Sequence, residues 1–181
     1  MSEYKFKTKP YAHQLRALKE AFDKEYYAFF MEMGTGKSKV LIDEIGGYFL
    51  RGKIDSAVII APKGVYRNWE RGEIPTHLPD DIPHVVATWR APSEMTKDDK
   101  KKLKDIVQPN GKLRIVLMNI EALSGSVGIK YATHFLNRNR SLLAIDESTT
   151  IKTPTASRTK NALKISKLAK FKRIMTGSPV T

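Results

Sequence analysis

The chain has 181 residues, a length that suits one domain with its own hydrophobic core. It contains no cysteine, which excludes disulfides, thiolate metal sites and cysteine nucleophiles, and no apolar run approaches the roughly 18 residues that span a bilayer. Lysine and arginine number 32 against 19 acidic residues, and the resulting charge of +13 favours a polyanionic partner such as nucleic acid, or else a basic surface that only keeps the protein soluble.

The first ten residues, MSEYKFKTKP, lack the apolar run of a secretory signal, so we expect a cytoplasmic protein. The next segment, AHQLRALKEAF, places Leu15, Leu18 and Phe22 three to four positions apart. This spacing puts the three side chains on one face of a helix, which predicts an amphipathic helix over residues 12–22.

Short apolar runs recur along the rest of the chain, and segments with helical spacing lie between them. The runs are continuous and rich in Ile and Val rather than alternating, which is typical of strands covered on both faces. Strands are predicted at 26–31, 56–61, 84–88, 113–118, 141–145 and 172–176, and helical segments at 37–50, 62–74 and 157–169. This alternation predicts an α/β fold with a mostly parallel central sheet flanked by helices. The charged segment 91–105 is interpreted as a solvated loop and helix face.

The stretch MEMGTGKSKV, residues 31–40, follows the first predicted strand and contains most of a phosphate-binding loop. The full pattern is a glycine, four residues of any kind, then Gly-Lys-Ser or Gly-Lys-Thr, and Met31 stands where the first glycine is expected. Glycines let the backbone wrap around phosphate oxygens, and the helix N-terminus adds partial positive charge. Lys37 would then reach the β- and γ-phosphates, and the Ser38 hydroxyl would bind Mg²⁺. The alternative is a helix start that contains Gly-Lys-Ser by chance.

Two carboxylates, Asp146 and Glu147, stand at the end of the predicted strand SLLAI. In phosphate-loop ATPases an aspartate at a strand end holds Mg²⁺, and a neighbouring glutamate can activate the attacking water. Alone, the pair could equally be a strand-exit turn with solvated acids. Beside the glycine loop, it favours a MgATP site with Lys37, Asp146 and Glu147 as catalytic residues.

Six stretches of the chain, in order, resemble the motifs of the first RecA-like lobe of superfamily 2 helicases and translocases, specifically the Swi/Snf-type DNA-dependent ATPases. The resemblance covers nearly the whole chain and includes a pair, Asn68-Trp69, that is characteristic of the Swi/Snf group. The chain departs from the usual motifs where Ser148 and Thr149 replace Ala-His and where Ser178 replaces Thr. The six stretches are KPYAHQLRAL, MEMGTGKS, VIIAPKGVYRNWERGEI, IVLMNIEAL, LLAIDESTTIKTPTASRTKNAL and RIMTGSPVT.

The resemblance implies a three-layer RecA-like P-loop NTPase domain over residues 1–181 that uses ATP and Mg²⁺. Gln14 would read the adenine edge, and Ser38 and Asp146 would hold Mg²⁺. A segment after the second strand and an asparagine after the fourth would contact DNA phosphates, and the last motif would couple ATP to DNA movement. The implied ATP-binding residues are Gln14, Met33, Gly34, Thr35, Gly36, Lys37 and Ser38, the DNA-binding residues are Pro62, Lys63, Gly64 and Asn119, and the coupling residues are Thr176, Gly177, Ser178 and Pro179.

Several positions keep a simpler interpretation. Trp69 is expected to pack in the fold rather than to stack on a base, and Lys63 could be an ordinary surface lysine. His13 and His77 lack the spacing of metal ligands, so no metal site is expected there. Because the first position of the loop varies in this family, Met31 is expected to end the strand and to pack inward.

The resemblance also implies a function and partners. We expect translocation on double-stranded DNA; the alternatives are a strand-separating superfamily 2 helicase, a restriction-type motor, or a degenerate module that binds DNA or a protein without ATPase activity. Family members have a second RecA-like lobe that carries an arginine finger, and no such segment follows Thr181 here. We therefore expect lobe 1 of a two-lobe motor, monomeric by itself and weak or inactive in ATP hydrolysis, because losing such an arginine can remove roughly 10³–10⁵ in rate. The compact lobe favours a bacterial or viral source, with a nuclear location if the source is eukaryotic.

Overall fold

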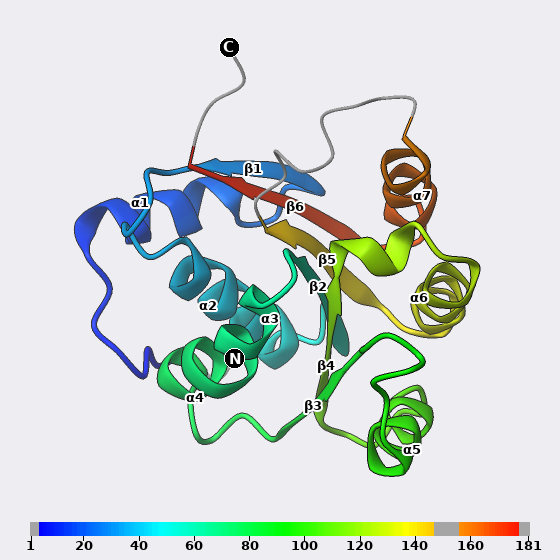
Figure 1. Cartoon of the computed structure of the whole chain (residues 1–181). Coiled ribbons are helices and arrows are strands. Elements are labelled where there is room, and N and C mark those ends of the chain that lie inside the picture. The colour runs from blue at the N-terminus through cyan, green and yellow to red at the C-terminus, as the bar shows by residue number, and fades with distance from the viewer. Residues whose placement is uncertain (1–3, 147–155, 178–181) are drawn as a thin grey trace.

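The computed structural model describes residues 4–146 and 156–177. At its centre is a six-stranded sheet in which every neighbouring pair of strands is parallel, in the order β1-β6-β5-β2-β4-β3 (Figure 1). The prediction of a mostly parallel sheet is confirmed, and each predicted strand lies within one residue of its predicted bounds. The strands are β1 (Tyr26–Phe30), β2 (Ser56–Ala61), β3 (His84–Thr88), β4 (Leu113–Asn119), β5 (Ser141–Asp146) and β6 (Phe171–Thr176).

Helices cover both faces of the sheet, which confirms the three-layer architecture (Figure 1). One face carries α1 (Ala12–Ala21), α2 (Lys37–Leu50), α3 (Val65–Asn68), the π-helical turn η1 (Trp69–Glu73) and α4 (Ile74–His77). The other carries α5 (Lys97–Asp105), the 3-10 turn η2 (Ile120–Leu123), α6 (Ser126–Arg138) and α7 (Ser157–Ser166). Each layer buries its own apolar cluster against the sheet, which is the driving force for this arrangement.

Burial along the strands follows from their places in the sheet. Every residue of β2 is buried, as are nearly all residues of β4 and β5, because these three strands are covered on both faces. The edge strands β1 and β3 contain exposed and half-buried positions as well as buried ones. Among the described helices, none is both long enough and apolar enough to cross a membrane.

Helix α6 was not predicted from the sequence. Its segment contains a glycine and several β-branched or aromatic residues, which lower the intrinsic preference for helix. The structure explains Gly128, because a Cβ there would lie 2.3 Å from the backbone oxygen of Ala122, so only glycine lets α6 pack so closely on η2. The predicted helical segment 62–74 is divided among α3, η1 and α4, and the predicted helix over 157–169 ends earlier, at Ser166.

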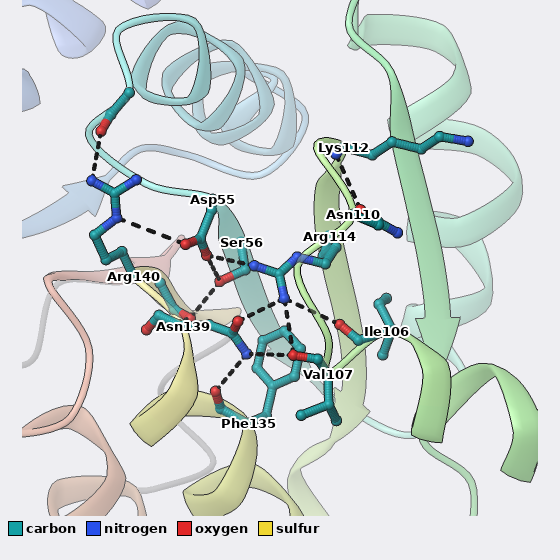
Figure 2. A network of polar contacts seen from close by, with 12 residues as sticks. Asp55, Ser56, Ile106, Val107, Asn110, Lys112, Arg114, Phe135, Asn139 and Arg140 are labelled. Carbon is teal, nitrogen blue, oxygen red and sulfur yellow. Dashed lines mark hydrogen bonds and ion pairs between the residues drawn. The ribbon is translucent and has the colours of Figure 1, made fainter.

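A buried polar network closes the amino edge of the sheet (Figure 2). Arg114 in β4 is 1% exposed; its Nη1 donates to Oδ1 of Asn139 at 2.6 Å, and its Nη2 pairs with Oδ1 of Asp55 at 2.9 Å. The hydroxyls of Ser56 and Ser141, which begin β2 and β5, share a hydrogen bond of 2.7 Å. The network ties together the amino ends of three neighbouring strands, whereas the predicted site residues lie at the carboxyl ends.

Candidate functional site

The predicted site residues gather at the carboxyl edge of the sheet, because parallel strands all end there. The glycine loop follows β1, and Asp146 ends β5, with β6 lying between these two strands. Thr176 at the end of β6 is paired with Phe30 of β1, and the N–H of Met31 donates to the oxygen of Thr176 at 3.3 Å. The sheet order therefore brings the glycine loop and the last motif of the sequence into contact.

The loop between β1 and α2 has the backbone form that a phosphate-binding loop requires. Gly34 and Gly36 have φ angles of +77° and +80°, in the left-handed region that side chains disfavour. Helix α2 begins at Lys37, so its first N–H groups and the positive end of its dipole face this loop. The ammonium of Lys37 donates to two backbone oxygens of the loop, at 2.8 and 3.1 Å, and Ser38 follows it, half-buried, on the first turn of the helix. A glycine loop before a helix N-terminus is the kind of backbone arrangement that binds anions in other proteins.

Gln14 of α1 makes a hydrogen bond to the backbone of this loop. Its side chain is buried, Nε2 donates to the oxygen of Thr35 at 3.0 Å, and Oε1 accepts the N–H of Tyr11 at 2.9 Å. A Cβ on Gly36 would lie 2.3 Å from Nε2 of Gln14, so a larger residue there would displace the Gln14 amide. A ring nitrogen of His13 lies 3.0 Å from the same oxygen of Thr35. The role of Gln14 as a reader of adenine stays a prediction.

A hollow of about 340 Å³ lies beside the loop, within the usual size range of small-molecule sites. On its wall, Lys39 pairs with Asp43 at 2.7 Å, and Tyr4 donates to the same carboxylate at 2.8 Å. Burial raises the pKa of the Asp43 carboxyl, and the bonds from Lys39 and Tyr4 act in the opposite direction. Burial also lowers the pKa of His77. The lining residues are Thr8, Lys9, Tyr11, His13, Gln14, Gly34, Thr35, Gly36, Lys39 and His77.

The described part of the last motif touches the glycine loop. A Cβ on Gly177 would lie 3.1 Å from Cγ of Met33 and 3.8 Å from Nζ of Lys37. The end of β6 therefore borders the loop, as a coupling element must. Ser178 and Pro179, the other two predicted coupling residues, lie outside the described residues.

The carboxylate of Asp146 accepts a hydrogen bond of 3.0 Å, on Oδ2, from the indole N–H of Trp69. Trp69 is 1% exposed, which confirms that it packs in the fold. The hydrogen bond itself was not predicted, because it joins residues 77 positions apart and no spacing in the sequence indicates it. Glu147, the predicted water-activating residue, lies outside the described residues.

The predicted DNA-binding residues lie at the ends of two neighbouring strands. Ala61 of β2 is paired with Asn119 of β4, so the loop that follows β2 leaves the sheet beside Asn119. Lys63 and Gly64 in this loop are exposed. Asn119 accepts the N–H of Ala122 on Oδ1 at 2.8 Å and thereby caps η2. The cap gives Asn119 a structural role, and the DNA contacts of this group stay predictions.

Replacing Met31 with glycine is expected to reduce stability and to leave nucleotide affinity unchanged. The Met31 side chain packs against the core cluster, whereas its backbone N–H and C=O, which contact β6 and Lys37, would remain in glycine. The lost burial and the added backbone freedom should lower the free energy of unfolding by about 1–3 kcal/mol. Thermal melting and titration with Mg²⁺ and a fluorescent ATP analogue measure the two effects. A large loss of affinity at an unchanged melting temperature would show that the side chain serves the nucleotide.

Comparison with known proteins gives a family and a shared fold. A family model described as an SNF2-related domain matches residues 18–181. No curated protein matches the chain by sequence. Among solved structures, the chain resembles the Sulfolobus solfataricus SWI2/SNF2 ATPase core in complex with double-stranded DNA, with a TM-score of 0.72 and 18% identity over 99% of this chain and 34% of that one.

Two further structures share the fold. The UvsW helicase from bacteriophage T4 matches with a TM-score of 0.67 and 15% identity, over 94% of this chain and 53% of that one. A nuclease-deletion mutant of the Type ISP restriction-modification enzyme LlaGI, in complex with a DNA substrate mimic, matches with a TM-score of 0.68 and 12% identity, over 96% of this chain and 18% of that one. The chain thus spans about half or less of the length of these three chains.

Proposed function

Because the chain belongs to the SNF2-related domain family, we propose that it is the ATP-binding lobe of a DNA-dependent ATPase that couples ATP hydrolysis to translocation on double-stranded DNA. The observation that carries the proposal is the position of the glycine loop, Lys37 and Asp146 at one edge of a parallel sheet. Ligands of open α/β sheets bind at this edge, and the loop supplies the anion site that a triphosphate needs.

In this proposal, the loop N–H groups and Lys37 bind the phosphates, with Lys37 giving up its two backbone oxygens for phosphate oxygens. The Ser38 hydroxyl and the Asp146 carboxylate are oxygen donors of the kind that Mg²⁺ prefers, and they would hold the ion. When bound, Mg²⁺ supplies charge neutralisation to the phosphates. Glu147 would orient and deprotonate the attacking water. The contact of Gly177 with the loop would pass the change at the phosphates to β6.

The adenine would enter the hollow beside the loop, with Gln14 at its wall. An amide side chain offers both a donor and an acceptor, which suits the adenine edge. Full ATP turnover would need a second RecA-like lobe to complete the site. By itself the 181-residue chain would therefore bind MgATP but hydrolyse it weakly.

Binding of duplex DNA by the chain is expected to be modest and to weaken as salt is raised. If the exposed loop after β2 and its neighbours neutralise two phosphates, affinity should fall about tenfold between about 50 and 200 mM salt. Fluorescence anisotropy of a labelled duplex over a salt series measures this slope. The variant Lys63→Ala should lose about one phosphate contact. The slope of log affinity against log salt concentration should therefore become shallower by about one.

Lys24→Ala is the matched control for Lys63→Ala, because Lys24 is an exposed lysine that precedes β1 at the amino edge of the sheet. Its salt slope should equal that of the unmodified chain. If affinity for the duplex did not depend on ionic strength, or if the two variants changed the salt slope equally, the loop after β2 would not be part of the DNA interface.

A second candidate function is strand separation, as in a true helicase. The fold is shared with the UvsW helicase and with a restriction-modification enzyme, so the architecture alone does not separate these activities. The Asn68-Trp69 pair favours the translocase, since it is a Swi/Snf feature of the sequence. Displacement of a triplex strand without unwinding of a duplex, by the intact two-lobe protein, distinguishes translocation from strand separation.

A further inference from the structure

We propose that Trp69 is a positioning residue for the magnesium-binding carboxylate of Asp146. The inference rests on the proposed function, because it concerns how the chain presents that carboxylate to MgATP. The indole N–H donates to Oδ2 of Asp146 at 3.0 Å from a ring that is 1% exposed. The proposal concerns this hydrogen bond rather than the bulk of the ring.

The sheet order explains how Trp69 reaches a residue so distant in sequence. β2 and β5 are neighbours, with Ile60 paired to Ile145, so the two strands end side by side at Ala61 and Asp146. After β2 the chain turns at Gly64, whose φ is +91°, and runs through α3 into the π turn that begins at Trp69. π turns are rare and often mark functional sites. Here the segment directs the indole to the end of β5.

The chemistry of the pair suits a metal ligand. An indole nitrogen can only donate, and a carboxylate oxygen accepts this hydrogen bond. A carboxylate has about four lone-pair sites, so one that accepts an N–H can also bind a cation. Groups that orient a metal ligand in this way typically contribute 10–100-fold to metal affinity. The packed ring cannot turn away, and it therefore holds the Asp146 side chain in one orientation.

The same segment also begins with the loop that we propose to bind DNA. Lys63 and Gly64 lie between β2 and α3, and the chain then continues directly to Trp69. The hydrogen bond therefore connects the proposed DNA loop to the proposed metal ligand through a short, packed stretch of backbone. Trp69 is thus placed to keep the proposed DNA loop and the Asp146 carboxylate in a fixed position relative to each other.

The test compares Trp69→Phe with Trp89→Phe in the full 181-residue chain. Trp89 is the matched control, because it is the second tryptophan of the sequence, it is also buried, and it packs in the other core cluster against Tyr131. Affinity for a fluorescent ATP analogue is measured with Mg²⁺ and with EDTA. In Trp69→Phe, the gain in affinity caused by Mg²⁺ should be about tenfold smaller than in the unmodified chain. In EDTA, the two chains should bind the analogue with equal affinity. Trp89→Phe should keep the full Mg²⁺ effect.

Two further measurements separate positioning from packing. In an Asp146→Ala background, Trp69→Phe should cause no additional loss of Mg²⁺-dependent affinity. In the Trp89→Phe chain, the single remaining indole N–H signal in a nitrogen–proton NMR spectrum reports on Trp69 with its ring intact. This signal should shift on addition of the analogue with Mg²⁺, and it should shift less with the analogue in EDTA. This second readout needs no change at Trp69 and decides the case if Trp69→Phe does not fold.

The outcomes distinguish this inference from the proposed function. If the unmodified chain gains affinity from Mg²⁺ and Trp69→Phe gains equally, with an indole signal indifferent to Mg²⁺, the positioning role is wrong and the proposed function stands. If the unmodified chain binds the analogue no better with Mg²⁺ than with EDTA, both fail. A tenfold loss confined to Trp69→Phe, absent in the Asp146→Ala background, supports the positioning role.

Discussion

Replacing Glu44 with alanine is expected to lower the free energy of unfolding by about 3–5 kcal/mol, because it leaves the buried charge of Arg173 unpaired. Both side chains have 0% exposure, and Nε and Nη2 of Arg173 donate to the Glu44 carboxylate at 2.8 and 2.5 Å. Burial raises the pKa of the Glu44 carboxyl, and the hydrogen bonds from Arg173 act in the opposite direction. Urea denaturation measures the loss, and the melting temperature should fall by about 6–20 °C.

Two variants sharpen this prediction. Glu25→Ala removes the carboxylate paired with Lys172, the residue that precedes Arg173, and Glu25 is largely exposed, so the denaturation midpoint should barely change. The double variant Glu44→Leu with Arg173→Met removes both charges and should recover most of the lost stability. A midpoint for Glu44→Ala as high as that of Glu25→Ala would show that the buried charge finds another partner.

The buried pair also matters for the proposed function. Glu44 belongs to α2, the helix that begins at Lys37, and Arg173 belongs to β6, the strand that ends at Thr176. The pair therefore fixes the phosphate-binding helix against the strand whose end borders the glycine loop. We expect the pair to keep α2 and β6 in a fixed relative position.

Replacing Lys37 with alanine is expected to weaken binding of MgATP about 100-fold, which corresponds to about 2.7 kcal/mol. The ammonium lies within the glycine loop at the N-terminus of α2, where its charge adds to that of the helix dipole. Removing it takes away the single positive side-chain charge that the loop, residues 31–38, contributes. Titration with a fluorescent ATP analogue and Mg²⁺ measures the effect.

Lys101→Ala is the matched control. Lys101 is exposed, and its helix α5 covers the opposite face of the sheet from α2, the helix that follows the glycine loop. It should bind MgATP as the unmodified chain does. The melting temperature of Lys37→Ala should stay close to that of the unmodified chain, because the lost contacts are two hydrogen bonds in a surface loop. Equal, weak binding by Lys37→Ala and the unmodified chain would instead favour a module that binds DNA or a protein without using nucleotide.

Local patterns predicted much of the fold and part of the site. The strand positions follow from continuous apolar runs, and the glycine loop follows from residue types that only certain backbone forms accept, as the left-handed Gly34 and Gly36 show. The place of Asp146 at a strand end was equally visible, because a carboxylate after an apolar run marks where burial stops. Helix α6 was missed, because Gly128 is explained by a contact with Ala122 of η2 rather than by its own segment.

The sequence by itself determined all six strands, most of the helices, the parallel arrangement of the sheet and the identity of the loop, because these depend on short-range periodicity and on the conformational preferences of single residues. Only the tertiary structure decided which side chains meet: Trp69 with Asp146, Arg173 with Glu44, and Gln14 with the glycine loop. The physical reason is the strand order, in which β6 is inserted between β1 and β5, and β5 beside β2. Contacts between elements that this strand order brings together depend on how the whole sheet assembles. They cannot be predicted from residue spacing along the chain.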